Sequence, residues 1–540
     1  MKINKDSTMQ AEIDHATTQL ENLDLVADVD NVAMKALLNP LILQKVFCSL
    51  DTKTLKSARL VCTLWADVGA APLGKQGRHV FRTRSDLESN KAMASLNPEL
   101  LKNVKILFEG YKTCNCVYII CWCTPTLPLD FVWILPQISD KLETLEVFYV
   151  TAFEPIRELW SSYNFPHLAR IRILADREYL DEAEPMLKEM AEFRPLPNLK
   201  VFSLRMFSGC RNPSSRAQMS TICQNLINSS PNLEEFELHS TFYVDLTACG
   251  KLKKFTFNYD PTGSFEFEIS ETTKMLESGR TSLESLILNY TMENDDSIEL
   301  NFYFPNLTHL QTNAADVYVL KDSVNTTNLP KLTHFSMSTI DYPFQFEISG
   351  MLSRYHLRHV GITSLDICCK NHFPRIGNNE DGEAARRLVD LFPSVKELKF
   401  NLKIVVFRDY DQYFFDLMEI MRSFGEWELS RGEVDFHLKA CQGPEINDHH
   451  ERDFVSLFII AVLRGMTGWT GLANTSLKFS TDWRRPAEFR LLDEVRDAIL
   501  SCRTIRSLAI SGLLMDAETK NNLETFIREQ NLPIITRFNN

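Results

Sequence analysis

The sequence predicts an α/β solenoid that follows a small helical unit. Two observations lead to this fold class. An apolar pattern, Leu-x-x-(Leu/Phe)-x-Leu, recurs with starts at positions 142, 168, 199, 233, 252, 283, 307 and 332, and recurrence at this spacing is the main signature of stacked repeats. Ahead of the repeats, residues 37–65 carry apolar side chains at helical spacing. The chain is therefore expected to have a short helical part and a long repetitive part.

Each repeat predicts one short strand and one return segment. The last two apolar residues of the pattern share one face of a strand, because alternate residues of a strand point to opposite sides. A single repeat cannot bury that face, whereas stacked repeats share one continuous core. Phe-Pro, Leu-Pro or Ser-Pro pairs end several of the return segments. The pattern occurs at Leu101-Val104-Ile106, Leu142-Leu145-Val147, Leu168-Ile171-Ile173, Leu199-Phe202-Leu204, Leu233-Phe236-Leu238, Leu252-Phe255-Phe257, Leu283-Leu286-Leu288, Leu307-Leu310, Leu332-Phe335-Met337, Val395-Leu398-Phe400 and Ile505-Leu508-Ile510.

The helical unit is predicted to contain three short helices. Pro40 fits the first turn of the first helix, and Asp51 fits the N-cap of the second. The apolar stripe of the first helix, at i, i+3, i+4 and i+7, consists of Leu43, Val46, Phe47 and Leu50. The apolar residues after it are Leu55, Leu60, Val61, Leu64 and Trp65. Helices this short bury little surface alone, so the unit is expected to need a partner or a neighbouring domain.

This stretch resembles an F-box. The resemblance is carried by Leu38, Pro40, Ile42, Leu43, Val46, Phe47 and Leu50, followed by Leu55, Leu60, Val61, Cys62 and Trp65. The Leu-Val-Cys-x-x-Trp ending is its most specific part. The sequence departs from the family at Leu41, where an acidic residue is common, and at Asn39-Pro40, where the proline often comes one place earlier. The alternative is an ordinary helical start to an α/β domain.

The resemblance implies a non-catalytic substrate receptor of a Skp–cullin–F-box ubiquitin ligase, with no cofactor. A Skp-family adaptor would bind the F-box and connect it to a cullin scaffold, while the repeats would hold an unknown target protein. The adaptor-binding residues that the resemblance implies are Leu38, Pro40, Ile42, Leu43, Val46, Phe47, Leu60, Val61, Cys62 and Trp65. The alternative is a repeat scaffold whose N-terminal helices only cap the solenoid, burying Leu38 and Leu43 against residues 101–106.

The repeats resemble leucine-rich repeats in an irregular form, over roughly residues 98–510, with weaker patterning from about 402 to 500. The regular repeat has Asn or Cys three residues after its last strand leucine, and this chain does not. The expected organisation is a disordered acidic tail over 1–35, the F-box over 36–78, and an irregular leucine-rich-repeat solenoid over 79–540. A helix from Asp516 to Gln530 is expected to cap the last repeat.

The solvent side of the predicted strands is the candidate surface for a target protein. Residues between the inward-pointing positions project from it. The candidate residues are Glu235, Glu237, Lys254, Asn289, His309, Gln311 and His334. Their mixed chemistry does not indicate a ligand class.

Composition argues against several classes of partner. The net charge of −13 disfavours nucleic-acid binding, since an acidic chain repels phosphates. No stretch reaches about 18 uninterrupted apolar residues, so no membrane span is expected. Thirteen cysteines and no signal-like start favour reduced thiols in the cytoplasm, the nucleus or both.

Two groups of residues are considered as metal ligands. Cys114 and Cys116, like Cys121 and Cys123, form C-x-C pairs and not the C-x2–4-C pairs of common zinc sites, and the four are expected to be buried thiols instead. His449 and His450 lie in a polar stretch that is expected to be an exposed loop. The sequence contains no phosphate-binding loop, dinucleotide fingerprint, HExxH or GxSxG motif. An enzyme is therefore not expected.

Overall fold

The structure is a computed structural model of the 540-residue chain. The described residues are 35, 37–82, 97–108, 127, 129–150, 154–175, 193–206, 213–259, 268–290, 298–299, 303–313, 318–319, 323–339, 348–352, 355–372, 380–406, 411–440, 448–469, 474–481, 489–502, 504–511, 513 and 515–539. The expected tail, apart from Lys35, and the cluster Cys114 to Cys123 lie outside them.

The chain divides into two compact units. The first comprises residues 1–148 and 163–169, and the second comprises residues 149–162 and 170–540. The helices at the start of the first unit are α3 (Pro40–Ser49), α4 (Thr52–Ala58), α5 (Thr63–Val68) and α6 (Ala70–Gln76). The three predicted helices correspond to α3, α4 and α5, and α6 is an additional helix within residues 37–78.

Local sequence explains where these helices begin. The Asn39 side chain accepts a hydrogen bond from the Leu41 N–H at 2.9 Å, and Pro40 occupies the first turn of α3. The Asp51 side chain caps α4 by accepting from the Thr54 N–H at 2.7 Å. Hydrogen bonds from Thr54 hold the pKa of Asp51 below its usual range. The departure from the F-box pattern at Asn39-Pro40 therefore still gives a capped helix.

Parallel strands make up the sheet of each unit. The first unit contains β1 (His79–Arg82), β2 (Asn103–Leu107) and β3 (Thr144–Val150), paired in that order. In the second unit the neighbouring strands are β4 (Arg170–Ala175), β5 (Val201–Met206), β6 (Glu235–Ser240), β7 (Lys254–Tyr259), β8 (Ser285–Tyr290), β10 (His309–Thr312), β12 (His334–Ser338), β13 (Ser364–His372), β14 (Glu397–Val406), β15 (Arg431–Ala440), β16 (Asn474–Thr481), β17 (Ser507–Ser511) and β18 (Ile535–Asn539). A separate small pair joins β9 (Ile298–Glu299) to β11 (Tyr318–Val319).

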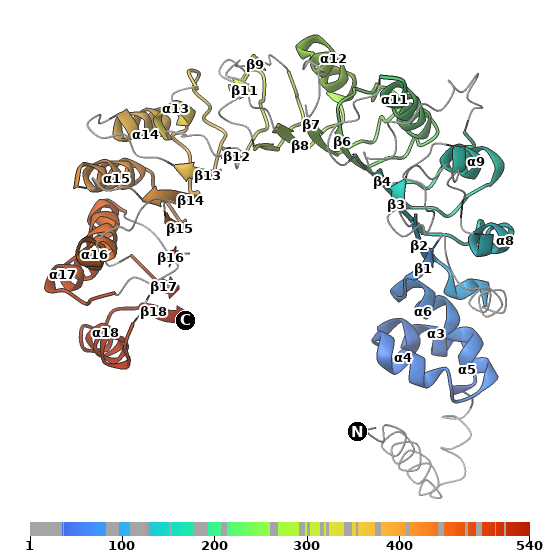
Figure 1. Cartoon of the computed structure of the whole chain (residues 1–540), viewed down its shortest axis with the longest axis horizontal. Coiled ribbons are helices and arrows are strands. Elements are labelled where there is room, and N and C mark those ends of the chain that lie inside the picture. The colour runs from blue at the N-terminus through green and yellow to red at the C-terminus, as the bar shows by residue number, and fades with distance from the viewer. Residues whose placement is uncertain are drawn as a thin grey trace, which may run out of the picture. The chain divides into compact units, whose positions relative to one another are not determined.

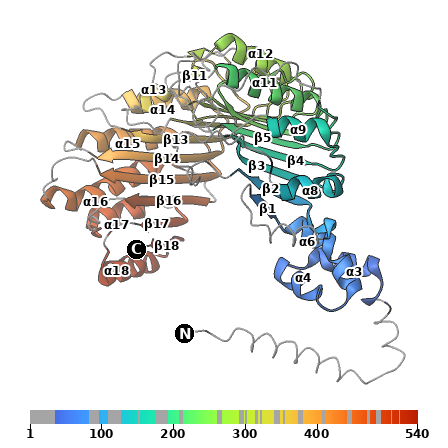
Figure 2. The same cartoon turned by 45° about the vertical axis from the view of Figure 1, so that its right-hand side comes forward.

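Helices connect many of these strands. The first unit has the short 3-10 helix η1 (Pro98–Leu100) and α8 (Leu129–Ile138). The second unit has α9 (Glu154–Ser162), α11 (Pro213–Asn228), α12 (Ile269–Gly279), α13 (Ile348–Leu352), α14 (Glu380–Leu391), α15 (Asp411–Phe424), α16 (Asp448–Gly465), η3 (Met466–Gly468), α17 (Asp493–Ser501) and α18 (Ala517–Glu529). Within the second unit, Figure 1 shows α11, α12 and α14 to α18 on one side of the strands, and Figure 2 shows the strands stacked edge to edge. The described parts form a parallel-strand sheet with helices, as a repetitive α/β fold requires.

Every predicted repeat pattern coincides with a strand. The apolar positions of neighbouring repeats align in register, so that Phe202 pairs with Phe236 and Phe236 with Phe255. Their rings stack with centroids 5.2 and 5.4 Å apart, and all three are buried. This aromatic row shows how stacked repeats bury the apolar face that a single repeat would leave exposed.

Several parts of the sequence prediction are corrected. The strand β1 lies ahead of the first predicted repeat, which begins at Leu101. The weakly patterned region 402–500 contains the long strands β15 and β16. His449 and His450 lie at the start of α16 and not in a loop. The helix α18 begins after the N-cap Asp516 as expected, but one more strand, β18, follows it.

Strand length changes along the second unit. The strand β10 has 4 residues, whereas β14 and β15 have 10 each. Two buried tryptophans pack behind the longer strands, where Trp427 donates through Nε1 to the Phe392 carbonyl at 2.9 Å and Trp469 donates to the Met421 carbonyl at 2.6 Å. The indole N–H groups are thus satisfied inside an apolar core.

A buried neutral histidine makes the fold sensitive to acid. His359 is fully buried; its Nε2–H donates to the Leu329 carbonyl at 2.8 Å, and its Nδ1 accepts from the Gly361 N–H at 3.2 Å. Burial lowers the pKa of His359 below its usual 6.5. The unfolded chain therefore takes up a proton near pH 6.5, while the folded chain does so only at lower pH. We expect the free energy of unfolding to fall as the pH drops below about 6.5.

Urea unfolding followed between pH 7.5 and pH 5 tests this expectation. His359→Gln should be less stable than the parent chain at pH 7.5 but should lose less stability on acidification. His167→Gln, at an exposed position, serves as the matched control and should keep the parental pH dependence. An unchanged slope in the His359 variant would contradict the assignment.

Candidate functional site

The helix α3 has apolar side chains on two sides, and the described part of the chain covers only one of them. Leu43 and Phe47 are each 1 % exposed and form a core with Leu55 and residues of α6 and η1. Trp65 packs edge-on against Phe47 with ring centroids 5.4 Å apart. Its Nε1 donates to the Leu37 carbonyl at 3.1 Å. These contacts hold α3 and α5 together.

Several other apolar side chains between Leu37 and Val61 are open to solvent. Leu60 is 75 % exposed and Leu41 is 72 % exposed. The exposed apolar residues between Leu37 and Val61, called the apolar surface, are Leu37, Leu38, Leu41, Ile42, Val46, Leu60 and Val61. Such a gathering of apolar side chains on one small helical unit marks an interaction site.

The structure therefore sorts the predicted adaptor-binding residues into two groups. Leu38, Pro40, Ile42, Val46, Leu60, Val61 and Cys62 are exposed, and Trp65 is half-buried. The other two predicted residues, Leu43 and Phe47, are buried in the helical unit's own core, and their contact with an adaptor stays a prediction. Leu37 and Leu41 also belong to the apolar surface but were not predicted to contact the adaptor. Their i, i+4 spacing places them on one face of a helix and could have indicated that they act together.

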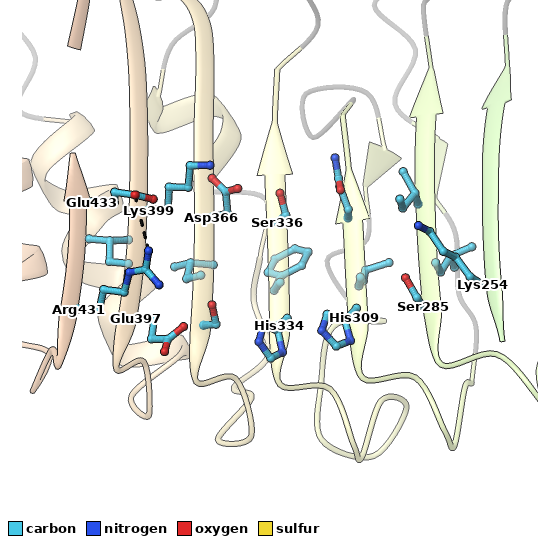
Figure 3. A pocket seen from close by; sticks show the side chains of 18 residues that line it. Lys254, Ser285, His309, His334, Ser336, Asp366, Glu397, Lys399, Arg431 and Glu433 are labelled. Atoms are coloured by element: carbon cyan, nitrogen blue, oxygen red, sulfur yellow. Dashed lines mark ion pairs between the residues drawn. The ribbon is translucent and has the colours of Figure 1, made fainter. Parts of the chain in front are cut away.

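A second candidate site is the inner face, defined as the side of the second unit's strands that carries the polar residues of alternating positions. The register places Lys254, Ser285, His309, His334, Ser364, Glu397 and Arg431 in one row across seven strands. Together with the row two residues further on, they line a hollow of about 380 Å³, shown in Figure 3. A neighbouring hollow of about 460 Å³ lies over β5 to β8 and β10.

All seven predicted target-binding residues lie on these hollows. His309 and His334 line the first, Glu235, Glu237 and Asn289 line the second, and Lys254 and Gln311 line both. The alternation of strand residues was thus sufficient to locate this face.

Polar contacts fix many side chains of the inner face. Glu237 accepts from the Ser203 hydroxyl at 2.8 Å and from Arg205 Nε at 2.9 Å. Asn289 donates to Asn258, while Gln311 donates to Asn313 Oδ1 at 2.9 Å. These contacts give the second hollow an ordered lining of carboxylate and amide groups.

A buried carboxyl lies in the first hollow. Asp366 on β13 faces between Ser336 and Lys399 (Figure 3). Burial, together with the Glu433 carboxylate, raises the pKa of Asp366, and Lys399 opposes that rise. Its Oδ1 is buried and has no hydrogen-bond partner among the described residues.

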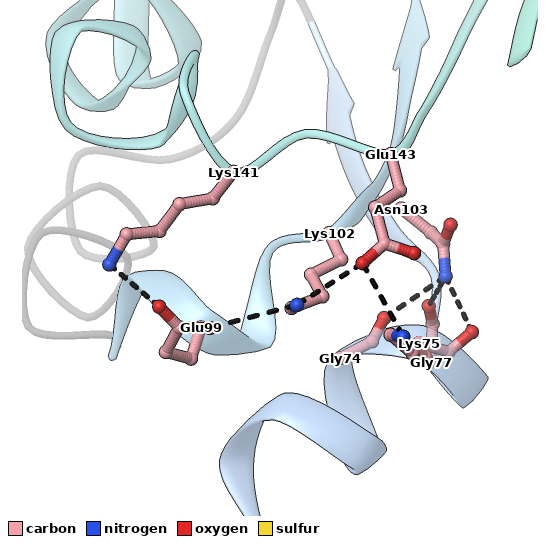
Figure 4. A network of polar contacts seen from close by, with 8 residues as sticks. All are labelled: Gly74, Lys75, Gly77, Glu99, Lys102, Asn103, Lys141 and Glu143. Carbon is pink, nitrogen blue, oxygen red and sulfur yellow. Dashed lines mark hydrogen bonds and ion pairs between the residues drawn. The ribbon is translucent and has the colours of Figure 1, made fainter. Parts of the chain in front are cut away.

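Polar contacts also join the helical unit to the first strands. Asn103 Nδ2 on β2 donates to the carbonyls of Gly74, Lys75 and Gly77 at 3.0, 2.6 and 3.2 Å, which satisfies the end of α6. Figure 4 shows this contact beside a chain of ion pairs. The members of that chain are Lys75–Glu143 (3.8 Å), Lys102–Glu143 (3.1 Å), Lys102–Glu99 (3.8 Å) and Lys141–Glu99 (2.8 Å).

The contact between α6 and η1 is unusually close. A Cβ on Gly74 would lie 2.2 Å from the Glu99 carbonyl oxygen, so only glycine fits there. Leu100 of η1 enters the same core as Leu43 and Leu73. Lys141 holds the pKa of Glu99 below its usual range, which keeps this ion pair charged at neutral pH. The helical unit and the start of the repeats therefore share one core and one polar network.

Comparison with known proteins identifies one part of the chain. The F-box domain family matches residues 36–69, which include α3, α4 and α5. No curated protein matches the chain. The described part of the chain contains no helix that is both long and apolar enough to cross a membrane. The chain therefore carries an F-box domain, the module that binds Skp-family adaptors, followed by a parallel-strand sheet with helices.

Proposed function

We propose that this protein is the substrate receptor of a Skp–cullin–F-box ubiquitin ligase. The observation that carries the proposal is the apolar surface of the matched F-box domain, which the described part of the chain leaves exposed. The adaptor would cover the apolar surface and link it to a cullin. The free cysteines among the described residues accord with a reducing compartment, and we place the protein in the cytoplasm, the nucleus or both.

The repeats would supply the target-binding part of the receptor. We propose that they form an irregular leucine-rich-repeat domain and that the inner face binds the target protein. In support, the two hollows hold ordered polar groups and the unpartnered Asp366 oxygen. Function in this proposal is proximity, because a tethered target has a high effective concentration at the ubiquitin-carrying enzyme. No catalytic group is assigned to this chain.

The alternative, a scaffold whose N-terminal helices only cap the solenoid, requires a different pattern of burial. Helices that only cap the solenoid would bury both Leu38 and Leu43 against the repeats. Leu43 is buried, but Leu38 is 54 % exposed. The exposed Leu38 favours a unit that binds a further protein.

Affinity purification of tagged chains, followed by mass spectrometry, tests the proposal. We expect the parent chain to recover a Skp-family adaptor, a cullin and a set of target proteins. Lys254→Glu, in both hollows, should lose target proteins and keep the adaptor. Lys274→Glu makes the same charge change on α12, where the Lys274 side chain is 70 % exposed, and should lose neither.

Two results would contradict the proposal in separable ways. Absence of the adaptor from the parent chain would contradict the role of the F-box domain. An identical set of target proteins with Lys254→Glu would contradict the placement of targets on the inner face.

A further inference from the structure

Two histidine rings lie parallel to one another in the first hollow of the inner face. His309 begins β10 and His334 begins β12, and the two residues are partners in the parallel register. Their rings are stacked with centroids 4.2 Å apart and planes 13° apart. The Nδ1 atom of each ring faces the hydroxyl of the preceding threonine, at 2.8 Å for Thr308 and 2.9 Å for Thr333. Because both rings are held in the same way, their Nε2 atoms point in nearly the same direction.

Hydrogen bonds of the neighbouring backbone indicate which ring nitrogen carries the proton. The Glu284 carbonyl accepts the N–H groups of Thr308 and His309 at 2.8 and 3.1 Å, and the Thr308 carbonyl accepts those of Thr333 and His334 at 3.0 Å each. Two N–H groups occupy both lone pairs of each carbonyl oxygen, although the two threonine hydroxyls also lie 2.9 and 3.3 Å from these oxygens. Each hydroxyl can therefore donate to Nδ1, which leaves the ring proton on Nε2.

The two Nε2–H groups form a pair of donors that is open to a ligand. No described residue forms a hydrogen bond with the Nε2 atom of His309 or His334, and both side chains are exposed. Two parallel donors suit a group with two acceptor oxygens side by side, as the parallel N–H groups of arginine suit a carboxylate. The direction of the donors therefore favours an oxyanion.

The charges of the hollow are arranged along its length. Lys254 lies at the β7 end, and Figure 3 shows Ser285 between Lys254 and the two rings. Neighbouring strands are about 4.8 Å apart, so Lys254 begins roughly 10 Å from His309, and its four-carbon stem can cover much of that distance. The carboxylates that line the hollow come from β13, β14 and β15, on the other side of the rings: Asp366, Glu397 and Glu433. An anion is therefore favoured at the end where Lys254 lies.

A single negative charge fits this end of the hollow better than a double one. Burial, and then the charge of His334, lowers the pKa of His309, so the two rings do not readily carry two positive charges. A phosphate group has a charge of about −1.5 to −2 at neutral pH and would be repelled more strongly by the carboxylates of the same hollow. A carboxylate has two oxygens and one charge, and so matches both the donors and the electrostatics.

We propose that an aspartate or glutamate side chain of the target protein binds across His309 and His334, with one carboxylate oxygen on each Nε2–H. The Lys254 ammonium attracts the same carboxylate, and the Ser285 hydroxyl adds a donor beside it. This inference rests on the proposed function, which places target proteins on the inner face. It adds that a target is selected by an acidic side chain.

Nuclear magnetic resonance of the full chain, labelled with 13C at histidine Cε1, tests the site without a known target. The probe is the N-methylamide of N-acetylglutamate, and the same derivative of glutamine is its uncharged match. At constant pH and ionic strength, we expect the glutamate probe to shift the signals of His309 and His334 in a saturable way, with one common dissociation constant. The glutamine probe should shift neither. His239, on the second hollow, should not respond to either probe.

Two variants assign the effect to the pair of rings. Phenylalanine keeps a stacked ring but has no N–H, so His309→Phe should weaken binding of the glutamate probe, observed at His334, by about tenfold or more. His334→Phe should do the same, observed at His309. His167→Phe, at an exposed position, is the matched control and should leave the binding unchanged. An unaltered His239 signal reports that the inner face keeps its fold in each variant.

The outcomes separate this inference from the proposed function. Absence of a shift, equal shifts with the glutamine probe, or unchanged binding in both phenylalanine variants would overturn the histidine site. Tighter binding of inorganic phosphate than of the glutamate probe would overturn the choice of a carboxylate. In affinity purification, the variant with both histidines replaced should lose target proteins and keep the adaptor. Probe binding by the parent chain together with unchanged targets in that variant would contradict the placement of targets on the inner face.

Discussion

Replacing Leu60 and Val61 with aspartate is expected to abolish binding of a Skp-family adaptor while the chain remains folded. Both side chains are exposed and lie in the turn between α4 and α5. Charged groups there cost nothing in the free chain but would be buried without partners in a complex. A loss of about 3 kcal/mol or more, about a hundredfold in affinity, is the usual effect at the centre of an apolar interface. Titration of purified adaptor against the variant measures it.

A core variant serves as the control for this experiment. Leu43→Ala should destabilise the helical unit by about 2–5 kcal/mol, because it leaves a cavity in a fully packed core. Leu43→Ala should therefore weaken adaptor binding and also lower the melting temperature. Leu60→Asp with Val61→Asp should weaken binding at an unchanged melting temperature. Undiminished adaptor binding by that double variant would show that the apolar surface is not the adaptor site.

Replacing Gly74 with alanine is expected to loosen the connection between the F-box domain and the repeats. The added methyl would lie 2.2 Å from the Glu99 carbonyl oxygen and 3.1 Å from backbone atoms of Leu100. Neither backbone can yield without moving α6 away from η1, and overpacking of this kind costs about 1–3 kcal/mol. Hydrogen exchange should become faster over residues 70–77 and 97–101. Adaptor binding should persist, because the apolar surface does not include α6.

Under the proposed function, the same variant should also slow ubiquitin transfer to a bound target. The contact between α6 and η1 restricts motion of the F-box domain against the first repeats of its own unit, and loosening it is expected to lower the effective concentration of the target's lysines. Gly250→Ala is the matched control, since nothing lies within 4 Å of a Cβ at that position. Unchanged hydrogen exchange in the Gly74 variant would contradict the close contact, and unchanged transfer alone would show that rigidity is dispensable.

The predicted strands are present because one short apolar pattern recurs along much of the chain. It failed to predict β15, where Gly432 pairs with Leu398 of β14 and interrupts the leading part of the pattern. The strand β13 was missed although Ile362, Leu365 and Ile367 fit the same spacing and are all buried. Sequence pattern therefore predicts strands wherever the apolar triplet is intact, and it underestimates how far the sheet continues.

The functional residues were predicted less completely than the fold. Leu43, Val46 and Phe47 of the α3 stripe were all predicted to contact the adaptor, whereas Leu43 and Phe47 fill the core of the helical unit. Apolar spacing identifies a helix with a buried side, but it does not say whether the covering surface comes from the same chain. The pairing of His309 with His334 was equally hidden, since the two residues are far apart in sequence and meet only through strand register.

The short strand β10 has a mechanical consequence for the second unit. In a stacked array each strand is held only by its two neighbours, and β10, with 4 residues, pairs over four positions with β8 and over four with β12. By contrast, β14 and β15 pair over ten. The resistance of the sheet to bending should increase with the number of hydrogen bonds between two neighbouring strands. The sheet should therefore bend most easily at β10. The parts of the sheet on either side of β10 are then expected to move as two stiffer bodies about this strand. His309 lies on β10, and His334 pairs with it from β12.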